Sequence, residues 1–125
     1  MVGFRIVIPR LVAGICFCAL VAWSQNGLIL RQEPVAAQTM AGHVYAEHTD
    51  LGMEGVLVEV CDSNWRNPAS FQRTDAEGYF SFPPLKKRRI YYLRLSRPNF
   101  NTLLVKVKLR PAAPRELKVY LQPAT

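Results

Sequence analysis

Residues 74–82 read TDAEGYFSF, and this stretch decides the fold. Asp75 can accept hydrogen bonds from backbone N–H groups two or three residues further on, and Gly78 can take a positive φ, so the two residues predict a tight turn. Phe80 and Phe82 then alternate with more polar residues, which places both phenylalanines on one face of a strand. The stretch therefore predicts a turn followed by a strand whose inner face fills a core.

The same alternation of apolar and polar residues recurs on both sides of this stretch. It predicts seven strands, at about 41–48, 56–63, 70–74, 79–82, 90–96, 102–110 and 115–122. The segments between them are rich in Gly, Pro, Asn and Asp, which favour turns. No segment after residue 40 has the spacing of an amphipathic helix. Short strands separated so regularly are typical of an all-β sandwich or barrel.

A set of spaced motifs is more specific than the alternation. Gly42-x-Val44 and Gly55-Val56-Leu57-Val58 are followed by the stretch at 74–82 and by Tyr91-x-Leu93-x-Leu95. This series resembles the carboxypeptidase regulatory-like domain, one of the transthyretin-like β-sandwiches, over about residues 40–122. The resemblance implies a seven-stranded Greek-key β-sandwich over residues 38–125. It also implies a structural turn motif, formed by Thr74, Asp75, Gly78 and Phe80.

The N-terminal segment, residues 1–37, has the pattern of a signal peptide followed by a short linker. Arg5 and Arg10 precede an apolar run of 13 residues at 11–23. A transmembrane helix needs about 20 apolar residues, so the run favours a signal helix and export to the periplasm, the cell surface or the medium. An uncleaved membrane anchor is the alternative. Small residues allow cleavage after Ser24 or after Ala37, and the sequence leaves both sites open.

The chain is basic, with 16 Lys and Arg, 9 Asp and Glu and a net charge of +7. Three of the bases and one of the acids precede residue 38, which leaves about +5 on the predicted domain. Lys86, Lys87, Arg88 and Arg89 stand together where the related family usually has a glycine. A basic patch inside a cell would suggest nucleic acid, but export argues against such a partner. We expect instead a protein or polysaccharide of the cell envelope, or peripheral contact with an anionic membrane; a solvated basic surface is the simplest alternative.

Catalytic and metal-binding patterns are not found in the sequence. His43 and His48 are five residues apart, so on one strand they would face opposite sides and share no metal. Asp75 and Glu77 offer two carboxylates, whereas calcium takes about six to eight oxygen ligands. Cys61 lies between acidic neighbours that raise a thiol pKa, the reverse of what a nucleophile needs. We therefore expect no catalytic residue, no cofactor and no metal, and we treat Cys61 as a small buried residue of a strand.

The sequence favours a non-catalytic, exported β-sandwich with an accessory, interaction or structural role. The alternative is a carbohydrate-binding module of the starch-binding type, in which Trp65 would be an exposed stacking surface. An enzyme is a more distant alternative. The candidate binding surface consists of Trp65 and the basic residues Lys86, Lys87, Arg88 and Arg89, while the ligand and the oligomeric state stay open.

Overall fold

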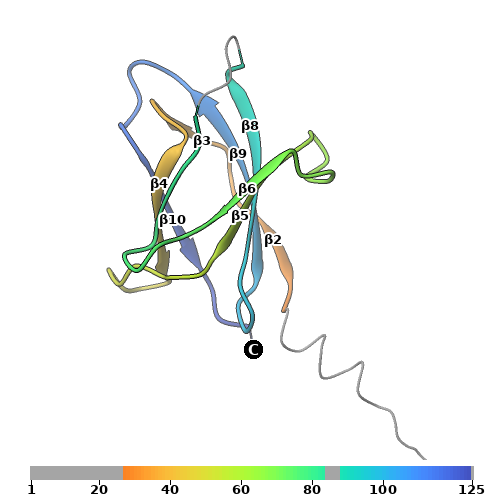
Figure 1. Ribbon diagram of the computed structural model, residues 1–125, viewed down its shortest axis with the longest axis vertical. Helices are drawn as coiled ribbons and strands as arrows, with labels where there is room; N and C mark the ends of the chain where they lie inside the picture. The colour runs from red at the N-terminus through yellow and green to blue at the C-terminus, as the bar shows by residue number, and fades with distance from the viewer. Residues whose placement is uncertain (1–26, 84–87, 125) are drawn as a thin grey trace, which may run out of the picture.

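The computed structural model describes residues 27–83 and 88–124, which form strands and no helix (Figure 1). The strands are β2 (Ile29–Arg31), β3 (Val35–Ala37), β4 (Ala41–Ala46), β5 (Leu57–Cys61), β6 (Ser70–Arg73), β7 (Tyr79–Ser81), β8 (Ile90–Ser96), β9 (Thr102–Leu109) and β10 (Leu117–Leu121). The predicted signal helix lies outside the described residues. The described residues contain no helix that could span a membrane.

The strands form two mixed sheets. The smaller sheet has three strands in the order β10-β4-β7, and β10 runs parallel to β4 with Leu117 opposite Gly42. The larger sheet has six strands, in the order β2-β9-β8-β5-β6 with β3 also paired to β9. The chain passes from one sheet to the other between β3 and β4, β4 and β5, β6 and β7, β7 and β8, and β9 and β10. After each passage, the next strand adds its inner face to the same core.

The core lies between the two sheets. Alternate residues of the smaller sheet, such as Val44, Phe80 and Val119, are at most 2% exposed and meet the inner residues of the larger sheet, such as Leu93 and Val105. Burial of these side chains supplies the main stabilising free energy, at about 25 cal/mol per Å² of apolar surface. The alternation seen in the sequence therefore identifies the inner faces of both sheets.

The all-β class and the approximate positions of the predicted strands are confirmed. The observed strands are up to a few residues shorter than predicted, apart from the strand at 90–96, whose bounds agree. The number of strands is different: the structure has nine in its described part, where the sequence predicts seven. The two additional strands, β2 and β3, come from the segment that the sequence analysis assigns to signal peptide and linker.

We call residues 27–37 the N-terminal strap, because they lie along β9 of the larger sheet. β2 pairs in parallel with the first part of β9, where Ile29 is opposite Thr102. β3 pairs with the last part, where Ala37 is opposite Leu109 and is fully buried. The register places Gly27 beside the start of β9 and Ala37 beside its end, at opposite ends of the sheet.

Candidate functional site

The turn motif at 74–78 is formed by side chains that bond to backbone. The Thr74 hydroxyl accepts a hydrogen bond from the Val56 N–H at 2.9 Å and donates one to the Met53 carbonyl. Asp75 Oδ1 accepts hydrogen bonds from the N–H groups of Glu77 and Tyr79, at 2.9 and 3.0 Å. These contacts join the turn to the segment before β5.

Gly78 has a φ of +82°, the left-handed conformation that favours glycine. A Cβ atom at this position would lie 2.5 Å from the Val44 carbonyl oxygen, so the backbones also approach too closely for a side chain. Phe80 follows two residues later and is 1% exposed. The hydrogen bonds from Tyr79 and then Glu77 lower the pKa of the Asp75 carboxyl. No group of three His, Cys, Asp or Glu residues within 27–83 and 88–124 is placed to hold a metal ion.

The predicted basic cluster is divided by the structure. Lys86 and Lys87 lie outside the described residues. Arg88 is half-buried: its guanidinium donates to the Ile90 carbonyl at 3.0 Å and to the Cys61 carbonyl at 3.5 Å, and lies 4.8 Å from the centroid of the Tyr91 ring. Arg88 therefore holds the start of β8 to the neighbouring strand. Arg89 is exposed and available to a partner.

Arg89 belongs to a basic hollow that the sequence did not predict. The hollow has a volume of about 380 Å³ and is lined by Arg89, Ile90, Lys108, Leu109 and Arg110. The start of β8 and the end of β9 bring these residues together, since Ile90 is opposite Lys108 and the Leu109 N–H donates to the Arg89 carbonyl at 2.8 Å. None of the three cations has an ion-pair partner within the described part of the chain. The hollow thus combines unneutralised positive charge with two aliphatic side chains.

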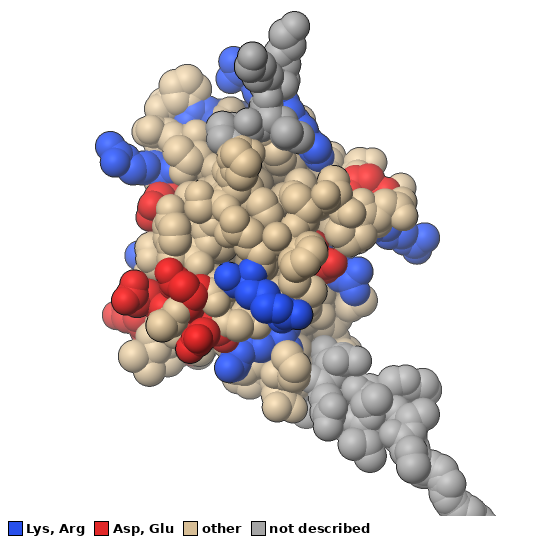
Figure 2. All heavy atoms as spheres, viewed as in Figure 1, with Lys and Arg blue, Asp and Glu red and all other residues tan. Residues whose placement is uncertain are grey.

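Acidic side chains gather near one end of the molecule. Figure 2 shows a group of Asp and Glu at the lower left, whereas Lys and Arg lie both beside this group and around the upper end. The turns at the lower end, 47–55 and 74–78, contact each other where Gly52 meets the backbone of Glu77. The acidic residues of these turns are Glu47, Asp50, Glu54, Asp75 and Glu77. The basic hollow, at the start of β8, lies at the opposite end of the sandwich from these turns, and we call its end the basic end.

Trp65 is half-buried and already has neighbours on the larger sheet. Its loop is fixed by Asp62, which accepts hydrogen bonds from the N–H groups of Asn64 and Arg66 at 2.8 and 3.0 Å. The indole meets the Tyr92 ring edge to face, with centroids 5.2 Å apart, and its N–H donates to the Val105 carbonyl at 3.4 Å. The guanidinium of Arg31, from the N-terminal strap, lies over the same indole. The sequence hypothesis of Trp65 as a free stacking surface is therefore not supported by its surroundings.

Cys61 is a buried residue of β5, only 3% exposed. Burial raises the pKa of its thiol, and the nearby Glu59 carboxylate raises it further. A thiol in these surroundings is a poor nucleophile. The expected direction of the pKa shift is confirmed, although burial is a larger cause than the acidic neighbours.

The outer face of the smaller sheet carries a row of aromatic rings that the sequence analysis did not identify. Tyr79 on β7, His43 and Tyr45 on β4, and Tyr120 on β10 form the row, with centroid separations of 5.2, 6.0 and 5.6 Å in that order. Their period-two spacing was visible, but the sequence does not show which strands are neighbours. We refer to these four residues as the aromatic row.

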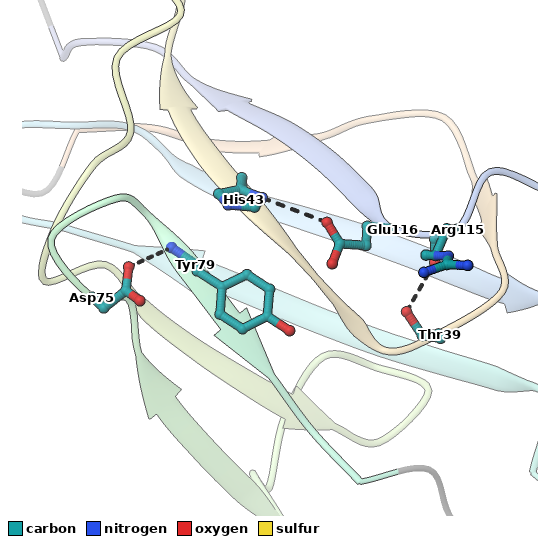
Figure 3. Close-up of polar contacts among 6 residues, drawn as sticks. All are labelled: Thr39, His43, Asp75, Tyr79, Arg115 and Glu116. Atoms are coloured by element: carbon teal, nitrogen blue, oxygen red, sulfur yellow. Dashed lines mark hydrogen bonds and ion pairs between the residues drawn. The ribbon is translucent and has the colours of Figure 1, made fainter.

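The two ends of the aromatic row adjoin hollows. Tyr79 lines one of about 350 Å³, together with residues that include Thr39, Arg115 and Glu116. Figure 3 shows Tyr79 of β7, His43 of β4 and Glu116, which directly precedes β10, close to one another, with His43 Nδ1 3.7 Å from Glu116 Oε1. Tyr120 lines the other hollow, of about 470 Å³, with the segment 47–50.

Comparison with known proteins does not assign the chain to a family. No protein-family model matches the sequence, and no curated protein is similar to it at a significant level.

Proposed function

We propose that this chain is an exported, non-catalytic β-sandwich module that binds an acidic polysaccharide of the cell envelope through its basic end. In this proposal the strands β4 to β10 are a Greek-key core of the transthyretin-like, carboxypeptidase regulatory-like type. The strand order and the repeated passage between sheets support it. The N-terminal strap is an addition to that core.

The observation that carries the binding proposal is the basic hollow. Arg89, Lys108 and Arg110 surround it, and no carboxylate in the described residues neutralises them. Guanidinium groups favour carboxylate and sulfate because they donate parallel hydrogen bonds. Ile90, 41% exposed, and Leu109 offer apolar contact to the carbon atoms of a sugar ring. A concave surface with this lining fits an anionic sugar better than it fits a flat membrane.

The position of the hollow favours a partner in the envelope over the membrane. That membrane is the one in which the N-terminal segment would lie if it were retained as an anchor. Arg89 lies at the end of β9, whereas Gly27 lies at its start. Eight strand residues separate the two ends by roughly 23 Å at about 3.3 Å per residue. A chain held by residues before 27 would present its basic end away from that membrane.

A salt series tests the binding proposal. We would measure binding of the purified protein to polygalacturonate and to vesicles containing phosphatidylglycerol, at about 0.01 M and about 0.15 M ionic strength. Screening shortens the reach of charge from about 30 Å to about 8 Å over this range, so binding to the polysaccharide should weaken several-fold. Binding to the vesicles alone would contradict the choice of polysaccharide.

Two variants that each remove three positive charges show where the polysaccharide binds. Replacing Arg89, Lys108 and Arg110 with Gln should abolish most of the binding. The control replaces Arg66, Arg73 and Arg97 with Gln, which removes the same charge away from the hollow. Arg88 is kept in both variants, because its hydrogen bonds belong to the fold. Equal losses in the two variants would show that net charge, and not the hollow, determines binding.

Mass spectrometry of the protein from its native host tests export, which predicts loss of at least the first 24 residues.

A further inference from the structure

The hollow beside Tyr79 differs in chemistry from the basic hollow. Its floor contains the buried residues Met40 and Phe82, and its rim contains Tyr79, Arg115 and Glu116. One guanidinium and one carboxylate stand together there, so the rim has no net charge. An uncharged ligand with both apolar and hydrogen-bonding surface fits such a lining.

The walls of this hollow are held in place by hydrogen bonds between distant parts of the chain. The Thr39 hydroxyl donates to the Arg115 carbonyl at 2.9 Å, which ties the entry of β4 to the entry of β10 (Figure 3). The Gln38 N–H donates to the Pro114 carbonyl at 2.8 Å, and the Gln38 side-chain amide donates to the Ala113 carbonyl at 2.8 Å. A site fixed in advance loses less conformational entropy when a ligand binds.

The polar groups of the rim can form further hydrogen bonds. In the described structure, the Tyr79 hydroxyl and the Arg115 guanidinium have no hydrogen-bond partner, and Glu116 has only the long contact to His43. A carboxylate and a guanidinium can each bond two neighbouring hydroxyl groups at once. The C–H groups on the face of a pyranose carry partial positive charge, which is attracted to the negative face of a tyrosine ring.

We propose that this hollow binds a pyranose ring of a neutral glycan, with Tyr79 as the stacking surface and Glu116 and Arg115 as hydrogen-bonding groups. The aromatic row extends the site across the smaller sheet, because its rings are spaced 5.2 to 6.0 Å apart, comparable to successive sugars of a linear chain. Tyr120, 39% exposed, lies at its far end. A linear oligosaccharide would run across β7, β4 and β10, and its affinity would increase with length. This site is separate from the proposed basic-end contact.

Calorimetric titration with neutral β-linked and α-linked glucose, xylose and N-acetylglucosamine oligomers of increasing length tests the proposal. At least one series should bind, with affinity that increases with chain length and does not change with salt. Tyr79→Ala should weaken binding about tenfold, and Tyr79→Phe should retain most of it because the ring remains. Tyr120→Ala should remove the gain from longer oligomers while leaving the short ones unaffected.

The matched control is Phe71→Ala, which removes an aromatic side chain, 65% exposed, from β6 of the other sheet. It should leave binding unchanged. Circular dichroism and the thermal midpoint would show that each variant is folded, and Tyr120→Ala tests the site if Tyr79→Ala is unstable. The proposal is overturned if no neutral oligomer binds at millimolar concentration, or if Tyr79→Ala and Phe71→Ala have the same effect. Binding that disappears on replacement of Arg89, Lys108 and Arg110, or on addition of salt, would assign the glycan to the basic end and also overturn it.

Discussion

The guanidinium carbon of Arg31 lies 4.4 Å from the centroid of the Trp65 ring. Arg31 is the last residue of β2, whereas Trp65 is in the loop between β5 and β6. A cation over an indole contributes about 0.5–1 kcal/mol at an exposed site. This contact joins the N-terminal strap to the far side of the larger sheet, and it assigns Trp65 a role in holding that strap.

Removal of the strap should destabilise the domain. A chain that begins at Gln38 loses β2, β3 and the buried Ala37, while a chain that begins at Gln25 keeps them. The loss includes hydrogen bonds from the N–H groups of Thr102 and Arg110 to strap carbonyls, at 2.8 and 2.9 Å. At about 1 kcal/mol for each net hydrogen bond, we expect the free energy of unfolding to fall by roughly 2 kcal/mol or more.

Denaturant unfolding of the two chains measures this difference. An equal midpoint would show that the strap contributes nothing to the fold. The same comparison bears on export: cleavage after Ala37 would remove a paired part of the sheet, whereas cleavage after Ser24 would leave it complete. A mature protein that begins at Gln38 and is fully stable would contradict the role given to the strap.

Two glycines with positive φ, Gly55 in the turn before β5 and Gly78 in the turn before β7, provide a matched pair. Gly55 has a φ of +80° with nothing within 4 Å of an added Cβ, whereas at Gly78 the Cβ would lie 2.8 Å from the Met53 nitrogen. Gly55→Ala should cost about 1 kcal/mol for the left-handed backbone alone. Gly78→Ala should cost roughly 2–4 kcal/mol, because the close backbone contact is added. Urea denaturation of both variants tests this, and equal losses would show that the close approach at Gly78 is relieved without cost.

The predictable part of the structure is the part with local periodicity. The strands from β4 to β10, apart from the edge strand β6, alternate apolar and polar residues, so their inner faces are visible in the sequence. β2 and β3 have three residues each and, unlike the equally short β7, follow no turn motif; they depend on pairing with β9 far along the chain. Their segment also contains Glu33 and Pro34, which the sequence pattern assigns to a linker.

The candidate binding surfaces could likewise be predicted only where their residues are neighbours in the sequence. The charge at 86–89 was evident from four consecutive bases, but the inward hydrogen bonds of Arg88 depend on the position of Cys61 on a neighbouring strand. The aromatic row needs the parallel register of β10 on β4, in which Tyr120 is opposite Tyr45. Since no local pattern determines that register, the row could not be predicted.

The loss of stability at acidic pH should depend on Asp75. Hydrogen bonds from Tyr79 and Glu77 lower the pKa of its carboxyl below the ordinary 3.8, so the unfolded chain binds its proton at higher pH than the folded chain does. The contribution is complete above about pH 4 to 5 and is lost as the pH falls through the lower, folded pKa. Asp62 has the same direction of shift, chiefly through the N–H of Arg66.

Asp75→Asn should therefore flatten the decline in unfolding free energy between about pH 5 and about pH 2. The measurement is a series of denaturant midpoints across this range. Asp50→Asn is the control, since its carboxylate accepts no hydrogen bond from any residue of the described structure. Curves for Asp75→Asn and the unmodified chain that stay parallel down to the lowest pH would exclude the carboxylate as the source of the decline.

Cys61 should react slowly with thiol reagents for as long as the domain is folded. A chain that begins at Gln25 lacks Cys16 and Cys18, so Cys61 is its one thiol. The side chain is 3% exposed, and burial together with the Glu59 carboxylate raises its pKa, so both access and thiolate population are reduced at neutral pH. We expect labelling by a chromogenic disulfide to be slow in buffer and fast in denaturant. The reference is Ser63→Cys in a Cys61→Ala chain, which places a thiol at an exposed position two residues away. Native labelling of Cys61 as fast as that of the reference would show that the thiol is accessible, and would reopen its assignment as a buried structural residue.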